Sequence, residues 1–297
     1  MNYIYSLIIP HHNMPDRLRR LLKSIPRRSD LQVLVIDDCS NKCMEEYIVL
    51  QKEYDWVEWY TTPTNGGAGK ARNIGIDHAK GRYVLFADSD DFFNPNFNDT
   101  LDKYLDSDYD IVYFTTSCLT EYTFENNNYL NFLNGTLHRY LKDVENIKYR
   151  LTYPWSKLIS MGVIKFNDIR FEESIVSNDV KFAMLCDYYA KKLKIDATAI
   201  YCYMLNTVSV SRSLNAEKIL ARLRVDAWRW RFVKDNHIKG RSLSLMMGGV
   251  MEKVNAYMNF HDKKKSYEIC KEYGISFVQF LCLLIRSKVK KLYYKIH

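Results

Sequence analysis

The sequence lacks long apolar runs and paired cysteines, and its first residues do not have the pattern of a leader segment. No apolar run reaches the roughly 18 to 20 residues that a helix needs to cross a bilayer. The first residues lead directly into the strand-like "YIYSLIIP", which is too short for a signal peptide and has no cleavage site. The seven cysteines include no C-x-x-C pair, which favours free thiols in a reducing compartment over a disulfide or zinc framework. We therefore expect a cytoplasmic, globular protein.

The spacing of two common nucleotide-binding loops is also missing from the glycine-rich segment "NGGAGKARN". A P-loop would need a glycine at Thr64 and a hydroxyl residue at Ala71. A dinucleotide fingerprint would need its third glycine at Arg72. What remains is a tight loop before a helix N-terminus, in which backbone N–H groups and Arg72 either meet a phosphate or hold the loop closed.

Positive charge is in excess, and much of it lies in the last third of the chain. The net charge is +8, and the terminal "IRSKVKKLYYKIH" carries five cations and no acid. No recognised nucleic-acid module accompanies this tail, so nucleic-acid binding is not expected. The tail either lies in a membrane interface or ends a core helix with a solvated basic end. Its apolar front falls at helical spacing and comprises Phe277, Phe280, Leu281, Leu284 and Ile285.

Strand-like and helix-like segments alternate through the first 116 residues. The strand pattern occurs in "YIYSLII", "LQVLVIDD", "WVEWYTT", "RYVLFAD" and "DIVYFTT". Between them, "DRLRRLLKSI", residues 43–53 and "GAGKARNIGIDHAKG" predict helices. Fully apolar strands that alternate with helices predict an α/β fold, whose mostly parallel sheet has helices on both faces.

The rest of the chain is less regular. Residues 117–150 are polar and weakly patterned, and we expect a loop-rich insertion there. "PWSKLISMGVI" restores the order, "FEESIVSNDVKFAMLCDYYAKKL" predicts a loop leading into a helix, and "AIYCYML" predicts a strand. Beyond residue 214 the patterns are all helical, so a helical extension is expected over residues 215–297.

Polar residues follow three of the predicted strands, in "PHHN", "DDCSN" and "DSDD". Because the carboxyl ends of parallel strands lie at one edge of a sheet, these segments should converge on one crevice. Asp88, Asp90 and Asp91 repel one another, so a cation or a sugar hydroxyl is a natural partner for them. Acidic residues also begin helices, and Asp91 would then simply precede the next helix.

The ordered series "SLIIPHHN", "VLVIDDCS", "NGGAGKARNIGI", "YVLFADSDD", "PWSKLI" and "SNDVKF" resembles the family 2 glycosyltransferases of GT-A fold, over residues 3–215. The resemblance implies a nucleotide-sugar-binding half over 1–116 and an acceptor-binding half over 117–214. It implies inverting, metal-dependent hexosyl transfer from a nucleotide-sugar, most simply a UDP-sugar, to a hydroxyl of a polysaccharide or lipid-linked oligosaccharide. Bacterial members of this size build capsule, O-antigen or lipooligosaccharide, as peripheral proteins on the cytoplasmic face of the inner membrane.

The resemblance also implies roles for residues on the donor side. Pro10 and Asn13 would line the base pocket, and Asp38 would accept the ring N–H of a uracil-like base. Arg72 would lie near the ribose or the diphosphate, and Ser89 would contribute to nucleotide-sugar binding.

The metal ligands follow in the same way. Asp88 would face the ribose and a metal-bound water, and Asp90 would bind Mn²⁺ or Mg²⁺ against both phosphates. The chain departs from the family pattern at Cys39, where glycine is usual, and at His11 and His12, where threonine and tyrosine are usual. Stacking of these histidines on the base and plain loop packing remain alternatives.

On the acceptor side, the resemblance makes Asp179 the base that deprotonates the acceptor hydroxyl and Trp155 a wall of the acceptor site. Asn178 stands where many members have glutamate, and it is a good helix N-cap. Asp179 could instead serve only to complement the helix dipole, and Glu172 and Glu173 remain rival bases.

Two other functions remain as alternatives. A sugar-1-phosphate nucleotidyltransferase shares the α/β architecture, but it needs a glycine-rich signature after the first strand, and "PHHNMPDR" has none. A non-catalytic homologue that only binds sugar nucleotides would be marked by loss of the acidic triplet, which is intact here.

Overall fold

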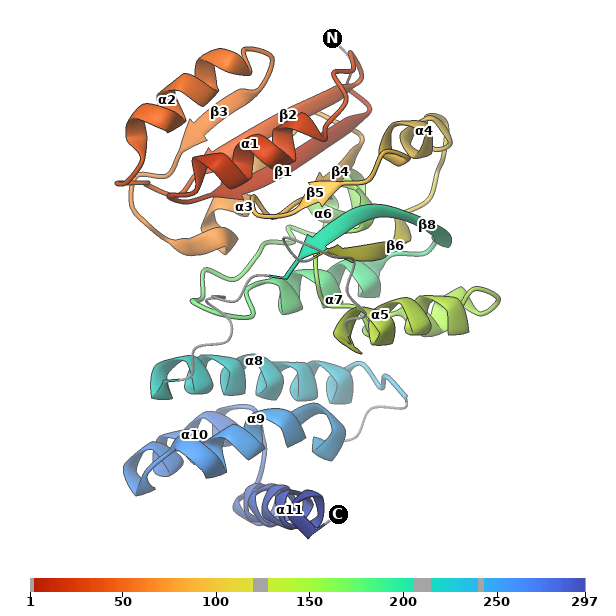
Figure 1. The fold of residues 1–297 in the computed structure, drawn as a ribbon. Coiled ribbons are helices and arrows are strands. Elements are labelled where there is room, and N and C mark those ends of the chain that lie inside the picture. The colour runs from red at the N-terminus through yellow and green to blue at the C-terminus, as the bar shows by residue number, and fades with distance from the viewer. Residues whose placement is uncertain (1–2, 120–127, 206–214, 240–242, 297) are drawn as a thin grey trace. The chain divides into compact units, whose positions relative to one another are not determined.

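The chain forms two compact units in a computed structural model that describes residues 3–119, 128–205, 215–239 and 243–296 (Figure 1). The first unit is built from Met1–Glu173 and Asn178–Thr207. The second unit is built from Ser174–Ser177 and Val208–His297.

A single eight-stranded sheet organises the described part of the first unit, in the order β3-β2-β1-β4-β7-β6-β8-β5. β1 pairs in parallel with β2 and β4, β2 with β3, and β6 with β8. β7 runs antiparallel to both of its neighbours, and β5 runs antiparallel to β8. The strands are β1 (Tyr5–His11), β2 (Leu31–Asp37), β3 (Glu58–Thr61), β4 (Tyr83–Phe86), β5 (Phe92–Phe93), β6 (Ile111–Leu119), β7 (Lys157–Ser160) and β8 (Leu193–Met204).

Helices cover the sheet because its central strands have no polar face. β1, β2 and β4 are buried along their whole length, so both faces of these strands need a cover. α1 contributes a buried leucine stripe, and α3 packs on β1 and β2. The predicted α/β fold is confirmed. The helices are α1 (Pro15–Lys23), α2 (Met44–Glu53), α3 (Gly67–His78), α4 (Phe97–Asp102), α5 (Asn128–Arg139), the 3₁₀ helix η1 (Val144–Ile147), α6 (Met161–Phe166) and α7 (Asp179–Tyr189).

Two expectations for the middle of the chain were wrong in detail. Residues 117–150 are not only loop, because β6 continues to Leu119 and both α5 and η1 follow. Leu133 and Leu137 of α5 are buried in the core of the first unit, which explains why the helix forms in a polar stretch. β8 begins at Leu193 rather than in "AIYCYML", because "LKID" pairs with β6 despite its charged residues.

The described part of the second unit is helical, as predicted, with α8 (Ala216–Asp235), α9 (Leu243–Tyr257), α10 (Phe260–Glu272) and α11 (Phe277–Ile296) (Figure 1). Its core gathers apolar residues from all four helices. Within the described residues, no helix is both long enough and apolar enough to cross a membrane.

The predicted apolar front of the tail divides between two faces of α11. Phe280 is 3% exposed and Leu284 packs against the core of the second unit. Phe277, Leu281 and Ile285 are exposed, with Ile285 at 60%. The front is therefore partly a core face and partly an outward apolar face.

Candidate active site

The carboxyl ends of β1, β2 and β4 lie side by side at one edge of the sheet. His11 is in register with Asp37, and the Asp38 amide donates to the His11 carbonyl at 2.7 Å. The amide of Ala87, just after β4, donates to the Ile8 carbonyl of β1 at 3.2 Å. The three polar segments that follow these strands therefore begin at one edge of the sheet, as the sequence predicted.

Asp38 holds the glycine-rich loop before α3. Its Oδ1 accepts from the Gly66 amide at 2.9 Å and from the Thr62 hydroxyl at 3.0 Å, and its Oδ2 accepts from the Gly67 amide at 2.6 Å. Gly67 has φ +81°, a conformation that side-chain-bearing residues rarely adopt. The carboxylate thus accepts hydrogen bonds from the free amides at the start of α3 and holds the loop next to β2. Contact between Asp38 and a base remains a prediction.

The other side chains of the predicted base pocket connect the same loops. Asn13, at φ 57°, accepts from the Asn41 and Lys42 amides through Oδ1, at 2.9 Å each. Pro10 is buried at the end of β1. His12 is half-buried and has its Nδ1 2.9 Å from the Asp38 carbonyl. The loops after β1 and β2 are therefore held together by side chains rather than by backbone pairing alone.

His11 is a buried packing residue. Its Nε2 accepts from the Met14 amide at 3.2 Å, so its Nδ1 carries the proton and donates to Asp37 at 2.9 Å. Its ring stacks on Tyr47, with centroids 5.0 Å apart. Burial raises the pKa of Asp37, but hydrogen bonds from His11 and Ser40 outweigh it and leave that pKa below its ordinary value. Of the two alternatives for His11, loop packing is the one that this geometry favours.

The acids after β4 form a tight turn in which the Asp91 amide donates to the Asp88 carbonyl at 3.0 Å. Asp88 and Asp90 are half-buried, whereas Ser89 and Asp91 are buried. Burial and the charge of Asp88 raise the pKa of Asp90, and burial with the charges of Asp88 and Asp90 raises that of Asp91. Arg17 lowers the pKa of Asp90 and has its Nη1 3.7 Å from Asp90 Oδ2, but both side chains are partly exposed, so the ion pair contributes little.

Arg72 connects this turn to the N-terminus of α7. Its Nη2 donates to Asp88 Oδ1 at 2.5 Å and its Nη1 donates to Asn178 Oδ1 at 3.0 Å. The guanidinium lies over the Phe171 ring, 5.2 Å from the centroid. Arg72 and Asn178 are 106 positions apart in the sequence, so this contact depends on the fold. The predicted contact of Arg72 with a ribose or diphosphate remains a prediction.

Asp179 is the first residue of α7, directly after Asn178. Burial raises its pKa, the charge of Arg72 lowers it, and the charge of Asp88 raises it, with a net upward shift. Of the rival bases, Glu172 lies 3.7 Å from Lys181, and Glu173 is exposed. Asp179 is thus the acid whose electrostatic surroundings include both Arg72 and the acidic turn.

Trp155 lies in a stack of aromatic rings. Its ring is 3.9 Å from that of Tyr153 and 5.5 Å from that of Tyr201, both nearly parallel to it. It is 5% exposed, so little of its surface is left for an acceptor. Its contact with an acceptor remains a prediction.

Tyr201 is a site residue that sequence reasoning missed. Its hydroxyl lies 2.9 Å from the Asp88 amide and 2.6 Å from Asp91 Oδ2, and its side chain is fully buried. "AIYCYML" has the pattern of an ordinary core strand, and only its pairing with β5 brings Tyr201 beside the acidic turn.

The carboxylates at the turn can bind a hard cation only if a bound molecule supplies further metal ligands. The charge of Asp88 raises the pKa of Asp90, so a divalent ion would offset the repulsion between these two carboxylates, and Mn²⁺ and Mg²⁺ prefer oxygen ligands. No group of three or more potential ligand residues occurs among the described residues. Asp88 and Asp90 therefore suit an ion whose remaining ligands come from a diphosphate and water.

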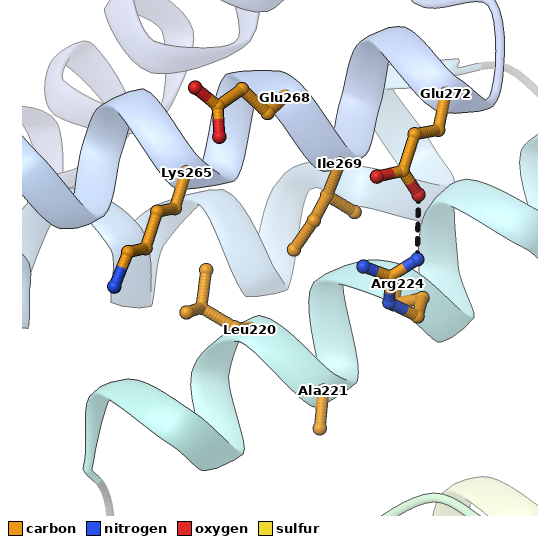
Figure 2. A pocket seen from close by; sticks show the side chains of 7 residues that line it. All are labelled: Leu220, Ala221, Arg224, Lys265, Glu268, Ile269 and Glu272. Carbon is orange, nitrogen blue, oxygen red and sulfur yellow. Dashed lines mark hydrogen bonds and ion pairs between the residues drawn. The ribbon is translucent and has the colours of Figure 1, made fainter.

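A cavity of about 300 Å³ lies within the second unit (Figure 2). Figure 2 shows α8 and α10 lining it, with an ion pair between Arg224 and Glu272 at 2.6 Å. Leu220 and Ile269 form its apolar floor. None of the predicted site residues lines it.

Comparison with known proteins gives a consistent family. The family model for Glycosyl transferase family 2 matches residues 6–166. An uncharacterised glycosyltransferase of Haemophilus influenzae is 36% identical over 93 residues, which are 30% of this chain and 30% of that protein. The poly(ribitol-phosphate) beta-N-acetylglucosaminyltransferase TarS of Staphylococcus aureus is 25% identical over 207 residues, 67% of this chain and 35% of TarS. The chain thus spans about a third of the length of these relatives.

Solved structures share the fold. Residues 1–349 of S. aureus TarS in complex with UDP-GlcNAc superpose with a TM-score of 0.62 at 20% identity, covering 93% of this chain and 91% of that one. The mannosyltransferase PcManGT from Pyrobaculum calidifontis, in complex with GDP-Man and Mn²⁺, superposes with a TM-score of 0.57 at 13% identity. The superposition covers 99% of this chain and 88% of PcManGT.

Proposed function

This chain belongs to glycosyltransferase family 2 and has the GT-A fold, and on that premise we propose that it transfers a hexose from a UDP-sugar to a hydroxyl group with inversion. The acceptor is a growing cell-surface polysaccharide or a lipid-linked oligosaccharide. In this proposal residues 1–116 bind the donor, residues 117–214 bind the acceptor, and residues 215–297 hold the protein at the cytoplasmic face of the inner membrane.

The observation that carries the proposal is the bridge that Arg72 makes between the acidic turn and the start of α7. Asp88 at one end of the bridge belongs to the strand edge where GT-A folds bind nucleotides. Asn178 at the other end precedes Asp179, the predicted base. One guanidinium thus contacts both the proposed leaving-group site and the residue next to the proposed base. Sugar transfer needs both of these groups close to the reacting carbon.

The chemistry follows from these positions. Asp179 accepts the proton of the acceptor hydroxyl as its oxygen attacks the anomeric carbon, and the bond from that carbon to the diphosphate breaks on the opposite face. The electron pair of that bond leaves with the nucleoside diphosphate. Mn²⁺ or Mg²⁺ on Asp88 and Asp90, when bound, supplies positive charge that stabilises this leaving group. Arg72 holds Asp88 in place for that task through their ion pair.

UDP is the nucleotide favoured by the likeness to TarS, whose structure holds UDP-GlcNAc. GDP is the next candidate, because PcManGT holds GDP-Man. A screen of UDP-, GDP- and dTDP-sugars that scores release of the nucleoside diphosphate identifies the donor. A homologue that only binds sugar nucleotides would bind one of them without turnover.

The Asp179→Asn variant tests the mechanism. We expect it to lose transfer by about 10²-fold or more while donor affinity stays within a few-fold, because the base contacts the acceptor and not the nucleotide. Transfer is measured by diphosphate release, and donor affinity by calorimetry. Glu173→Gln is the matched control and should keep full activity, since its carboxylate is exposed. Normal transfer by Asp179→Asn, with loss in Glu172→Gln or Glu173→Gln, would move the role of base to that residue.

A further inference from the structure

The buried carboxylate of Asp91 is directed into the sheet. It is 1% exposed, and its Oδ1 accepts from the Met204 amide at 2.7 Å. Its Oδ2 accepts from the Tyr201 hydroxyl at 2.6 Å. Both oxygens are thus occupied by β8, which separates the role of Asp91 from those of Asp88 and Asp90.

The Tyr201 hydroxyl holds both ends of the acidic turn. The Asp88 amide lies 2.9 Å from this hydroxyl and can only donate to it. The single hydroxyl proton is therefore directed to Asp91, so that one oxygen binds the first and the last residue of the segment Asp88–Asp91. Ser89 and Asp90 lie between these two anchor points.

The ring of Tyr201 has little freedom to move. It stacks on Trp155 at 12° with 5.5 Å between centroids, and Phe93 meets it edge-on at 5.5 Å. Phe93 belongs to β5, the short strand that directly follows the turn. β5 pairs with Tyr201 and Cys202 of β8. The hydroxyl is thus fixed by packing on one side and by strand pairing on the other.

We infer that Tyr201 is a positioning residue that holds the Asp88–Asp91 turn in the shape that binds a divalent cation together with a nucleoside diphosphate. The inference rests on the proposed function, and it assigns to Asp91 an anchoring role rather than a metal-ligating one. Tyr201 itself contacts neither the cation nor the donor in this assignment.

The Tyr201→Phe variant tests this, because it removes the hydroxyl and keeps the aromatic stack. Binding of UDP is measured by calorimetry with and without Mn²⁺, and Mn²⁺ binding is followed by electron paramagnetic resonance. We expect Mn²⁺-dependent UDP affinity to fall about ten- to hundredfold, as is usual when a group that orients metal ligands is lost. Metal-independent UDP binding should change little.

Tyr5→Phe is the matched control. Tyr5 is also fully buried, and its hydroxyl donates to the Leu101 carbonyl at 2.7 Å from the opposite end of β1. A similar fall in melting temperature in both variants, with Mn²⁺-dependent UDP binding lost only in Tyr201→Phe, supports the inference. Unchanged Mn²⁺-dependent binding in Tyr201→Phe overturns it and leaves the proposed function standing.

Asp91→Asn gives a second test, and measured by itself it should also lower Mn²⁺-dependent UDP affinity. Asparagine keeps only one of the two acceptor oxygens, so either the Tyr201 hydroxyl or the Met204 amide loses its acceptor and the anchor is broken. If Asp91 acts only through Tyr201, the two single variants and the double variant lose similar affinity. Losses of affinity that add in the double variant mean that Asp91 acts independently as a metal ligand, and they overturn the inference.

A wild-type chain that binds none of UDP, GDP and dTDP, with or without Mn²⁺, contradicts both this inference and the proposed function.

Discussion

At the scale of single residues, the acidity of Asp179 is controlled by opposing effects. Burial favours its neutral form, the Arg72 guanidinium favours the carboxylate, and the charge of Asp88 opposes it again. The net effect is a pKa above the ordinary value of an aspartate. A base with a raised pKa takes a proton more readily in the transition state, but it is also neutralised at a higher pH.

The pH dependence of transfer should reflect this shift. Since the carboxylate is the active form, the rate should fall as the pH drops through the raised pKa, at a pH above the value of about 4 that is usual for aspartate. The rate of transfer at saturating donor is measured across the acidic range, and donor affinity is measured at the same pH values as a control. A rate that stays flat down to pH of about 4, or that falls only in step with donor affinity, would contradict the assignment.

The sequence could predict which side chains gather at the sheet edge but not what they bind. Asp38, Arg72 and Asp88 were found from the polar ends of apolar strands and the start of a helix. Their partners come from distant segments: the Gly66 amide for Asp38, and Asn178 for Arg72. Such contacts depend on packing and leave no local pattern, which is why the role of Tyr201 was also missed.

At the scale of secondary structure elements, α3 is placed by two close approaches. A Cβ atom on Gly75 would lie 2.4 Å from Cγ2 of Ile8 in β1. A Cβ atom on Gly69 would lie 2.2 Å from the Glu172 carbonyl and 3.1 Å from Cβ of Asn178. The helix that carries Arg72 is thus packed against the sheet at one point and against the segment before α7 at another.

Replacing Gly69 should therefore disturb the site as well as the fold. Backbone atoms cannot move aside as a flexible side chain can, so we expect Gly69→Ala to cost about 1–3 kcal/mol of unfolding free energy and to lower transfer. Gly135→Ala in α5 is the control, because among the described residues no atom outside the adjoining helix backbone lies within 4 Å of its added Cβ, and it should stabilise the chain by about 0.5–1 kcal/mol. Urea unfolding of both variants measures these changes, and equal stability would contradict the close approach.

The elements themselves could be predicted where burial is uniform. Continuous apolar runs gave β1, β2 and β4, because a strand covered on both faces needs no polar residues. The first part of β8 carries Lys194 and Asp196 and was missed, since its pairing with β6 and not its composition makes it a strand. The two-residue β5 is too short for any periodicity.

At the scale of the whole molecule, the second unit combines an apolar outward face with a basic end. Phe277, Val278, Leu281 and Ile285 of α11 are exposed, and Arg286 begins the run of cations that ends the chain. The opposite face of the helix supplies Phe280 to the core. Truncation before α11 would therefore expose this core, and substitutions on the outward face are the better test of membrane binding.

The paired variant Val278→Ser with Ile285→Ser removes apolar surface from that face, and neither residue belongs to the core of the second unit. If the helix lies in the interface of an anionic membrane, the apolar side chains enter the acyl region and the cations contact the head groups. Each cation near the surface then contributes about 1 kcal/mol of binding free energy. The wild-type chain should then sediment with vesicles containing phosphatidylglycerol at low salt and less so at high salt, and the variant should bind several-fold more weakly.

Tyr257→Ser with Phe260→Ser removes exposed aromatic residues elsewhere in the unit and should bind as wild type does, with unchanged diphosphate release. Because the variant keeps all five cations, equal binding by the two paired variants would mean that charge alone holds the protein to the vesicle, and no sedimentation of the wild-type chain at low salt would remove the membrane from the proposed function.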